Sequence, residues 1–489
     1  MELLIIIAYG LFLSFIFLYS LVQLNLAISY KRYKKNGAGK FPDMPADKDL
    51  PMVTVQLPVF NELYVVERLI DCVAQLDYPA DKLEIQVLDD STDESFEVGA
   101  RKVAEWKAKG VNILHIKRPE RVGYKAGALA YGLTISKGEF TAIFDADFLP
   151  KPEFLRITIP YFLSDENIGV VQTKWEHINQ SFSVLTKLQA FGLDAHFTVE
   201  QMGRNRSGHF INFNGTAGVW RNKCIEDAGG WQADTITEDL DLSYRSQLKG
   251  WKFKYLVDFC SPAELPAEMN ALKSQQFRWT KGAAECAVKH LPRVIKQKKL
   301  GFGTKIHALF HLMNSFIFIC VFCTAILSVP MLLIKAKSTE YDVFFNAASL
   351  FLLSFVILAY FYWMSYETVK KYKWVNFIRE FPLFLSVSMG LSLHNSVAVI
   401  EGYIGKKTPF VRTPKFAIND EKGSWSNKKY RAFKTNPLTF FEGILTLYFA
   451  SGVVMAFITS DFALLPFHLM LILGYGYVFF YSLKHARIA

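Results

Sequence analysis

Several segments of this chain are too apolar and too long for a soluble protein. Residues 3–28 are almost wholly apolar and are followed by Lys31, Arg32, Lys34 and Lys35. About 20 apolar residues let a helix cross the hydrocarbon core of a bilayer, and cations mark its cytoplasmic end. A cleaved signal peptide would instead have a basic leading region and a shorter apolar run. We therefore expect a retained transmembrane anchor over residues 1–30, with residue 31 onward in the cytoplasm.

Four further apolar segments are long enough to cross a membrane, at residues 308–334, 343–365, 438–459 and 463–484. Within residues 376–404 the apolar stretch is short, running only from Phe381 to Leu393, which suits an interfacial or re-entrant segment better than a span. The loop at residues 405–436 carries nine cations and few acids. Because cationic loops stay in the cytoplasm, we expect five spans, with residues 376–404 not crossing.

The composition agrees with a membrane protein, since 51% of the residues are hydrophobic and 15% are aromatic. The net charge of +10 could point to nucleic acid, but Lys and Arg gather beside the apolar segments. We attribute the charge to membrane topology and expect no nucleic-acid partner. The six cysteines are scattered, with no paired spacing that indicates a disulfide framework or a zinc site.

Between about Pro51 and Trp251, short β-branched runs alternate with amphipathic stretches. This alternation is typical of βα units around a mostly parallel sheet, so we expect a soluble α/β domain there. Its first four strands are expected at residues 52–57, 84–88 and 112–116 and in the apolar run that begins at Thr141. Ligands of open α/β sheets bind beyond the carboxyl ends of the strands, so residues that follow a strand are site candidates.

Acidic residues follow three of these strands. Glu62 opens a helix after the first strand, Asp89 and Asp90 follow the second, and Asp145 and Asp147 follow the fourth. Strand alternation would place the last two on the same side of the chain. Mg²⁺ takes one or two protein carboxylates and completes its shell with water and phosphate oxygens, so this pair is a candidate metal site. The alternatives are solvated loop acids and, after the second strand, ordinary helix caps.

A basic, glycine-containing loop follows the third strand over residues 118–129 and includes Lys125. Free helix amides and Lys or Arg side chains favour anions, so the loop is a candidate diphosphate site. Solvated surface cations are the alternative. The loop is not a Walker loop, because the required spacing of glycine and Lys-Ser/Thr is absent.

Two later motifs each have a structural and a functional interpretation. In Thr237-Glu238-Asp239 the residue types suit the start of a helix, while the functional interpretation makes Asp239 a general base. In Gln275-x-x-Arg278-Trp279 the Trp could stack on a sugar ring while Arg and Gln bind phosphate or hydroxyls. An interfacial aromatic and basic anchor is the alternative for the second motif.

The chain resembles the membrane-bound processive enzymes of glycosyltransferase family 2, in the cellulose synthase and cellulose synthase-like group. Four spaced motifs in order carry this resemblance: Asp89/Asp90, Asp145-Ala146-Asp147, Thr237-Glu238-Asp239 and Gln275-x-x-Arg278-Trp279. The run from Gln86 to Asp93 and the element Lys125-Ala126-Gly127-Ala128-Leu129 look like the mannan and glucan synthase-like branch. The resemblance covers roughly residues 50–280.

The resemblance implies a GT-A fold over residues 50–280 that transfers a sugar from a nucleoside diphosphate with inversion at the anomeric carbon. It implies that Asp239, next to Glu238, removes the acceptor proton and that Asp145 and Asp147 hold Mg²⁺ or Mn²⁺. Trp279 would bind the acceptor sugar. The nucleotide would be bound by Glu62, Asp89, Asp90, Lys125, Gln275 and Arg278.

Residues 281–489 are expected to form interfacial helices and the transmembrane region. Within the cytoplasmic loop, Phe410, Thr413 and Lys415 resemble the gating loop of cellulose synthases, although Arg412 departs from the apolar residue expected there. We expect a cytoplasmic catalytic domain that elongates a β-linked polysaccharide and translocates it. The expected partners are UDP-glucose or GDP-mannose, a glycan or lipid acceptor, and the bilayer.

Two other functions compete with this expectation. A glycolipid synthase that moves one sugar to a membrane lipid can share the acids and the Gln-x-x-Arg-Trp element. A transporter or membrane scaffold with an inactive soluble domain would leave the four motifs as coincidence. The sequence does not distinguish UDP-glucose from GDP-mannose as the donor.

Overall fold

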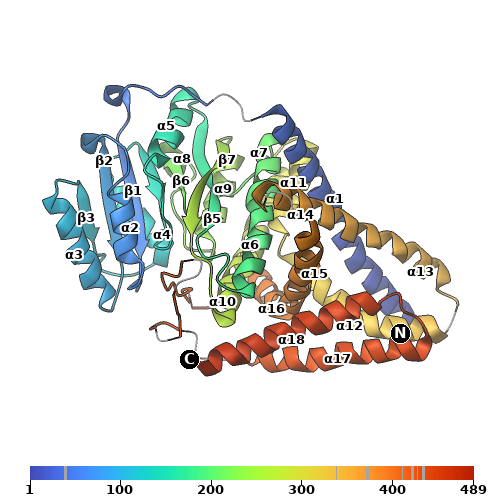
Figure 1. Cartoon of the computed structure of the whole chain (residues 1–489). Coiled ribbons are helices and arrows are strands. Elements are labelled where there is room, and N and C mark those ends of the chain that lie inside the picture. Colours follow the sequence, from blue (N-terminus) through green and yellow to red (C-terminus); the bar gives the residue numbers. More distant parts are fainter. Residues whose placement is uncertain are drawn as a thin grey trace.

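The computed structural model describes residues 1–37, 41–337, 339–370, 374–409, 411–419, 423–426, 428–431 and 436–488. An α/β domain occupies one side of the molecule and the long helices occupy the other (Figure 1). Helix α10 (Met269–Lys296) passes between them and contacts α9, α11, α16 and α18. It continues without a break through residues 280 and 281, where the sequence suggested the end of the soluble domain.

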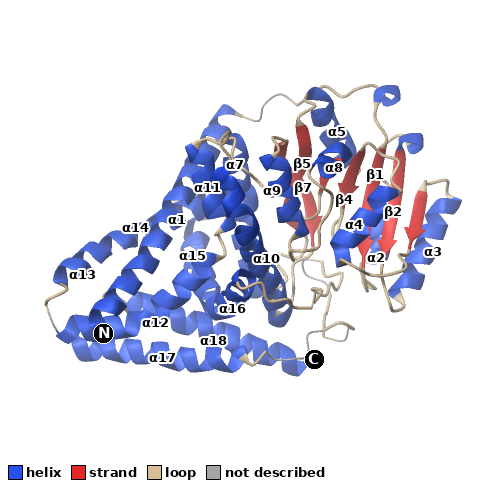
Figure 2. Cartoon of the chain, turned by 180° about the vertical axis from the view of Figure 1, so that it is seen from behind, coloured by secondary structure: helices blue, strands red, loops and turns tan. Residues whose placement is uncertain are grey.

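A seven-stranded sheet forms the centre of the α/β domain (Figure 2). Its strand order is β3-β2-β1-β4-β6-β5-β7, and β6 runs antiparallel to β4 and β5 whereas the other neighbouring pairs are parallel. The strands are β1 (Val53–Val59), β2 (Leu83–Asp89), β3 (Ile113–Ile116), β4 (Phe140–Ile143), β5 (Ile168–His177), β6 (Gly218–Arg221) and β7 (Lys252–Ala263).

The first four strands coincide with those expected from the sequence, with one informative difference. Strand β4 ends at Ile143, two residues before Asp145. Asp145 and Asp147 therefore lie in the turn after the strand, and strand alternation is not what brings them to the same side. The turn itself positions both carboxylates.

Helices cover both faces of the sheet, and strand alternation divides the core between them. Val219 packs in one apolar cluster and its neighbour Trp220 packs in the other. The first cluster includes residues of α2 (Val66–Val73), α3 (Ser95–Ala108) and α5 (Phe154–Ser164). The second includes residues of α4 (Tyr124–Thr134), α8 (Asn222–Asp227), α9 (Glu238–Leu248) and α7 (Gln201–Arg206), together with Ala27 and Tyr30 from the N-terminal helix.

Among the residues that the structure describes, five helices are long and apolar enough to cross a membrane, which fits a membrane protein. They are α1 (Glu2–Asn36), α12 (Phe316–Lys337), the continuous stretch Asp342–Lys370, α17 (Leu438–Thr459) and α18 (Leu465–Ile488). The stretch Asp342–Lys370 comprises α13 (Asp342–Ala348), a short 3₁₀ turn and α14 (Leu352–Lys370). Helix α1 contacts α7, α12 and α14, so it is packed into the molecule.

Two regions refine the boundaries expected from hydropathy. The apolar segment at residues 308–334 is divided, because α11 (Phe302–Leu312) ends in a turn before α12 begins at Phe316. Helices α15 (Trp374–Gly390) and α16 (Ser392–Tyr403) meet at a bend of 50°. If this bent pair counts as one span, the described residues hold six candidate spans instead of five. The remaining helix, α6 (Val184–Ala195), continues through a π-helical turn into α7.

Candidate active site

A cavity of about 240 Å³ lies beyond the carboxyl ends of β1, β4, β5 and β7. This is the edge at which open α/β sheets bind ligands. Most of the residues predicted from the sequence line it, although they come from distant parts of the chain. They are Glu62, Asp90, Lys125, Asp145, Asp147, Glu238, Asp239, Gln275, Arg278, Trp279, Thr413 and Lys415.

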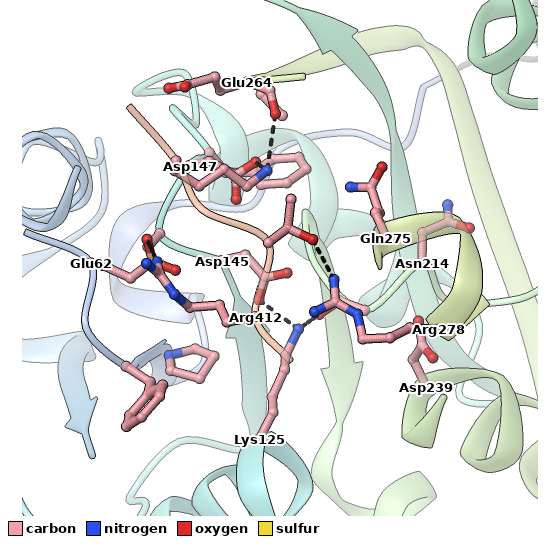
Figure 3. Close-up of a pocket in the computed structure, with 18 of the residues that line it drawn as sticks. Glu62, Lys125, Asp145, Asp147, Asn214, Asp239, Glu264, Gln275, Arg278 and Arg412 are labelled. Carbon is pink, nitrogen blue, oxygen red and sulfur yellow. Dashed lines mark hydrogen bonds and ion pairs between the residues drawn. The ribbon is translucent and has the colours of Figure 1, made fainter. Parts of the chain in front are cut away.

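The two acids after β4 each contact a lysine. Lys125, near the start of α4, places its Nζ 2.5 Å from Asp145 Oδ1 and donates to the Gly215 carbonyl at 2.8 Å (Figure 3). Lys415 comes from the loop before α17, and its Nζ lies 2.5 Å from Asp147 Oδ2 and 3.0 Å from the Glu264 carbonyl. Two carboxylates and two ammonium groups therefore form a compact polar centre in the cavity.

Asp239 and Glu238 form the first turn of α9. Thr237 occupies the N-cap position, but its side chain makes no capping hydrogen bond and its hydroxyl lies 3.5 Å from Cys286 Sγ. Asp239 Oδ1 accepts from the Leu240 amide at 2.8 Å. Burial, followed by the neighbouring charge of Glu238, raises the pKa of Asp239 to about 7. An acid titrating near neutrality is suited to general-base chemistry.

Gly215 lets the chain pass close to Asp239. Its φ is +78°, a conformation that glycine adopts without strain. A methyl group at this position would lie 3.0 Å from Asp239 Oδ2 and 3.4 Å from Lys125 Nζ. The glycine therefore provides space between two of the charged groups of the site.

The Gln-x-x-Arg-Trp motif lies on α10, and Gln275, Arg278 and Trp279 all line the cavity. Arg278 donates to Thr413 Oγ1 at 2.7 Å and to the Val411 carbonyl. Burial lowers the pKa of Arg278 to about 10 in spite of the charges of Asp145 and Glu238. At that pKa the guanidinium remains charged near neutral pH, so it can bind an anion.

Arg412 forms an ion pair with Glu62 inside the cavity (Figure 3). Burial raises the pKa of Glu62 to about 7, although the charge of Arg412 opposes this shift. The sequence marked Arg412 as a departure from the related gating loops and assigned it no partner. Its carboxylate partner lies on the first βα loop, a pairing that requires the folded chain. Phe410, the first residue of the predicted gating loop, lies outside the described residues.

The adjacent acids Asp89 and Asp90 have different surroundings. Asp89 is fully buried, its Oδ2 lies 2.9 Å from His115 Nε2, and its Oδ1 accepts from the Ser91 amide at 2.9 Å. Asp90 lines the cavity and is paired with Arg118. Of the two acids, the structure brings Asp90 to the site and places Asp89 behind it.

Several polar residues without a predicted role also line the cavity, among them Asn214, His177 and Glu264. Asn214 Oδ1 accepts from Gln201 Nε2 at 2.9 Å and from Asn212 Nδ2 at 2.7 Å, while its own Nδ2 is buried without a partner among the described residues. His177 ends β5 and holds its Nε2 3.4 Å from Asp194 Oδ1. A survey of the polar residues at the end of every strand, beyond the first four, would have included His177.

The donor set suits a hard divalent cation only in part. No group of three or more Asp, Glu, His or Cys side chains in the described part of the chain is arranged to hold a metal ion. Asp145 and Asp147 could supply two carboxylate ligands from one turn. Mg²⁺ and related cations are commonly bound by one or two carboxylates together with phosphate oxygens and water. The residues therefore fit a cation that arrives with a diphosphate.

Comparisons with known proteins agree with this fold. The family model described as glycosyltransferase like family 2 matches residues 51–282. Glucomannan 4-beta-mannosyltransferase 2 of Arabidopsis thaliana is 38% identical over 363 residues, which cover 69% of this chain and 66% of that protein. Glucomannan 4-beta-mannosyltransferase 1 of Oryza sativa subsp. japonica is 42% identical over 293 residues, which cover 57% of this chain and 56% of that protein. The matches thus span somewhat more than half of these relatives.

A solved structure provides an independent comparison of the fold. The mannosyltransferase PcManGT from Pyrobaculum calidifontis, in complex with GDP-Man and Mn²⁺, superposes with a TM-score of 0.55 at 19% identity. The superposition covers 82% of this chain and all of that one. Together, the mixed sheet and the site at its carboxyl edge define a GT-A-type domain, which confirms the predicted fold class. Residues 51–282 belong to glycosyltransferase-like family 2, and the resemblance inferred from the motifs is confirmed.

Proposed function

We propose that this protein is a membrane-bound, inverting glycosyltransferase that elongates a β-linked glycan from a nucleoside diphosphate sugar. One observation carries the proposal. A single cavity brings together two carboxylates suited to a cation, an acid with its pKa near neutrality, and the Gln, Arg and Trp of the α10 motif. This set contains a candidate group for each part of the reaction.

The residues of the site take complementary roles in the proposed reaction. Asp239 accepts the proton of the acceptor hydroxyl as that oxygen bonds to the anomeric carbon, and the bond from that carbon to the nucleoside diphosphate breaks. Lys125, Lys415 and Arg278 offset the negative charge of the departing diphosphate. A cation held by Asp145 and Asp147 would add electrostatic stabilisation to the same leaving group. Asp90 contacts the nucleotide, and Trp279 stacks on the acceptor sugar.

We further propose that the donor is GDP-mannose and that mannose is added through a β-1,4 linkage. The relatives in Arabidopsis and rice are named glucomannan 4-beta-mannosyltransferases, and PcManGT was solved with GDP-Man and Mn²⁺. UDP-glucose is the competing donor. The cation in the reaction is proposed to be Mn²⁺ or Mg²⁺.

A second cavity supports a polymeric product over a glycolipid. It has a volume of about 220 Å³ and shares Leu193 and Gln275 with the first cavity. Its other lining residues come from α6, α10, α12, α14, α15 and α16 and from Leu391 at the bend between the last two. They include Phe318, Tyr362 and Phe384 beside Gln189, Gln276 and Asn395. Aromatic faces and amide groups suit a chain of sugar rings. We propose that the growing glycan enters the helical region here.

We also propose that the α/β domain is cytoplasmic and that residues 374–403 do not cross the membrane. Lys34 of α1 pairs with Glu367 of α14 at 3.4 Å, so the cationic ends of these helices lie together. Helix α15 begins beside that end, where Lys370 lies 3.5 Å from Glu380. At the end of α16, Glu401 lies 3.2 Å from Lys281 of α10, next to the α/β domain. Both ends of the bent pair therefore contact the same side of the helical region.

The experiment that tests this function supplies the purified protein in lipid nanodiscs with a panel of labelled nucleotide sugars, with Mn²⁺, Mg²⁺ or a chelator. We expect transfer from GDP-mannose, dependence on the cation, and a product of high molecular mass that a β-mannanase digests. The variant Asp147→Ala should lose cation-dependent nucleotide binding, because one of its two carboxylate ligands is removed. A lipid-soluble product carrying one sugar would indicate the glycolipid synthase, and no transfer from any donor would overturn the proposal.

A further inference from the structure

A buried ion pair connects α10, which carries the Gln-x-x-Arg-Trp motif, to α17 in the C-terminal pair of helices α17 and α18. Lys273 is 3% exposed and Glu442 on α17 is fully buried. Lys273 Nζ lies 2.8 Å from Glu442 Oε1 and 2.9 Å from Oε2. The same ammonium lies 3.3 Å from Thr439 Oγ1 and 3.3 Å from Ser482 Oγ. All four side chains are enclosed, and the ammonium has an acceptor for each of its three protons.

Other polar groups near Lys273 also form hydrogen bonds with the C-terminal helices and with α16. The Met269 amide donates to His485 Nδ1 at 3.0 Å, and Asn270 Nδ2 donates to the Ser482 carbonyl at 3.2 Å. His394 Nε2 on α16 lies 3.0 Å from the Lys273 carbonyl, to which it donates. The first turns of α10 are therefore connected to α16, α17 and α18 together.

The helix geometry places this connection behind the substrate-facing side of α10. Successive residues of an α-helix are rotated by about 100°, so Gln275, Arg278 and Trp279 lie at about 200°, 140° and 240° from Lys273. These three residues line the candidate active site, whereas Lys273 contacts the membrane helices from the opposite side. A rotation of α10 about its axis would move all three away from the cavity.

The energetics favour a role in orientation over one in stability. Burying two charges has a large desolvation cost, and apolar replacement of such pairs is often neutral or stabilising. In some helical proteins, however, a buried polar or ionic group selects one register between helices. Lys273 is two residues from Gln275 on the same helix. A rotation of α10 that the ion pair fixes at Lys273 is therefore also fixed for the Gln-x-x-Arg-Trp motif.

We propose that Glu442, acting through Lys273, is a positioning residue that fixes the rotation of α10 and thereby aligns the acceptor with the donor sugar. This inference rests on the proposed glycosyl transfer. It predicts that loss of the pair leaves donor binding intact but lets water reach the anomeric carbon in place of the acceptor hydroxyl. Hydrolysis then yields nucleoside diphosphate and free sugar from the same donor.

The test uses the full-length protein in nanodiscs and compares Glu442→Gln, Lys273→Met and the charge-exchanged double variant Lys273→Glu with Glu442→Lys. The measured quantity is the ratio of donor hydrolysis to transfer, which does not depend on the fraction of active protein. Transfer should fall by about 10- to 100-fold in the single variants, because small misplacements of reacting groups have effects of this size. In the single variants the ratio of hydrolysis to transfer should rise, while nucleotide affinity should stay unchanged. The double variant should restore the ratio of the unmodified protein.

Lys335→Met and Asp461→Asn are the controls, because they remove an ion pair of 2.6 Å between α12 and the turn that joins α17 to α18, at the opposite end of that pair of helices. Neither should change the ratio. Parallel loss of hydrolysis and transfer in both single variants would overturn the inference, because it would indicate only less folded protein. An equal rise of the ratio of hydrolysis to transfer in the control variants would also overturn the inference.

A second measurement does not depend on catalysis. Spin labels at Val288 on α10 and Lys107 on α3, both exposed, report the position of the helix relative to the sheet. The distance distribution should shift or broaden in Glu442→Gln and recover in the double variant. An unchanged distribution in Glu442→Gln would refute the positioning role, whether or not the protein transfers sugar. Absence of transfer by the unmodified protein would instead refute the proposed function.

Discussion

The ammonium group of Lys415 lies 2.5 Å from the carboxylate of Asp147, across 268 residues of sequence. This contact brings the loop before α17 into the cavity at the carboxyl edge of the sheet. Arg412 of the same loop forms an ion pair with Glu62. The loop also accepts two hydrogen bonds from Arg278. The loop therefore contributes directly to the candidate active site, where its cations face the acids proposed to bind cation and nucleotide.

Lys415→Met should weaken nucleotide binding, because the side chain keeps its length but loses its charge. A hydrogen bond to a charged group contributes about 1.5–3 kcal/mol, so the Kd for a nucleoside diphosphate with Mn²⁺ should rise about 10-fold or more. Isothermal titration calorimetry measures this change. Lys407→Met is the control, since Lys407 belongs to the same loop but donates to the Asp234 carbonyl. Equal weakening in both variants would argue against a direct contact by Lys415.

Asp239→Asn should abolish transfer while leaving nucleotide binding nearly intact. The amide preserves the shape of the side chain but cannot accept the proton, a loss that typically costs about 10²- to 10⁴-fold in rate. Transfer rates and nucleotide affinity should be measured on the same preparation. Asp234→Asn, at a half-exposed acid paired with Lys289, provides the control. A comparable loss of nucleotide affinity in Asp239→Asn would contradict the general-base role.

Transfer should increase with pH through neutrality. The pKa of Asp239 is raised to about 7, so the carboxyl group is protonated and inactive as a base below that pH and ionised above it. The value of kcat/KM should therefore fall as the pH falls through about 7. Because the charge of Glu238 contributes to the raised pKa, Glu238→Gln should move the midpoint of this profile to lower pH. A midpoint that stays in place would show that another group controls the profile.

Gly215→Ala should reduce the rate of transfer by more than its loss of stability explains. The new methyl group would lie 3.0 Å from Asp239 Oδ2, so the carboxylate or the turn must move. Gly208→Ala provides a matched control, because Gly208 also has a positive φ, +68°, but open space around its Cα. Both variants should lose about 1 kcal/mol of unfolding free energy from backbone strain, measured by thermal denaturation. If the two variants retain equal activity, the close approach at Gly215 is unimportant.

A single cysteine at Ser424, introduced into a variant without the six native cysteines, tests the proposed topology. Ser424 is exposed and lies in the cationic loop, which should be cytoplasmic. An impermeant thiol reagent should therefore label it only after the membrane is opened. Thr339→Cys, between α12 and α13, should be labelled in intact cells and is the control. Labelling of residue 424 in intact cells would indicate six spans and would place the loop away from the α/β domain.

Local sequence pattern was sufficient for the first four strands, for the long apolar helices and for most of the motif residues. Strands β1 to β4 follow from short β-branched runs, and the five long helices follow from apolar length. Asp90, Asp145, Asp239 and Trp279 were predicted because the resemblance rests on short motifs with ordered spacing, and all of them line one cavity. Such signals are local, so they can be recognised in the sequence without knowledge of the packing.

Only the tertiary structure decided which groups meet across long distances in the chain. It buried Asp89 against His115 while leaving Asp90 at the cavity, although the two acids are adjacent in sequence. It paired Arg412 with Glu62 and Lys273 with Glu442, and it brought Asn214 to the cavity. Burial, charge pairing and side-chain direction depend on how distant elements pack, and no local pattern of hydrophobicity or spacing contains that information.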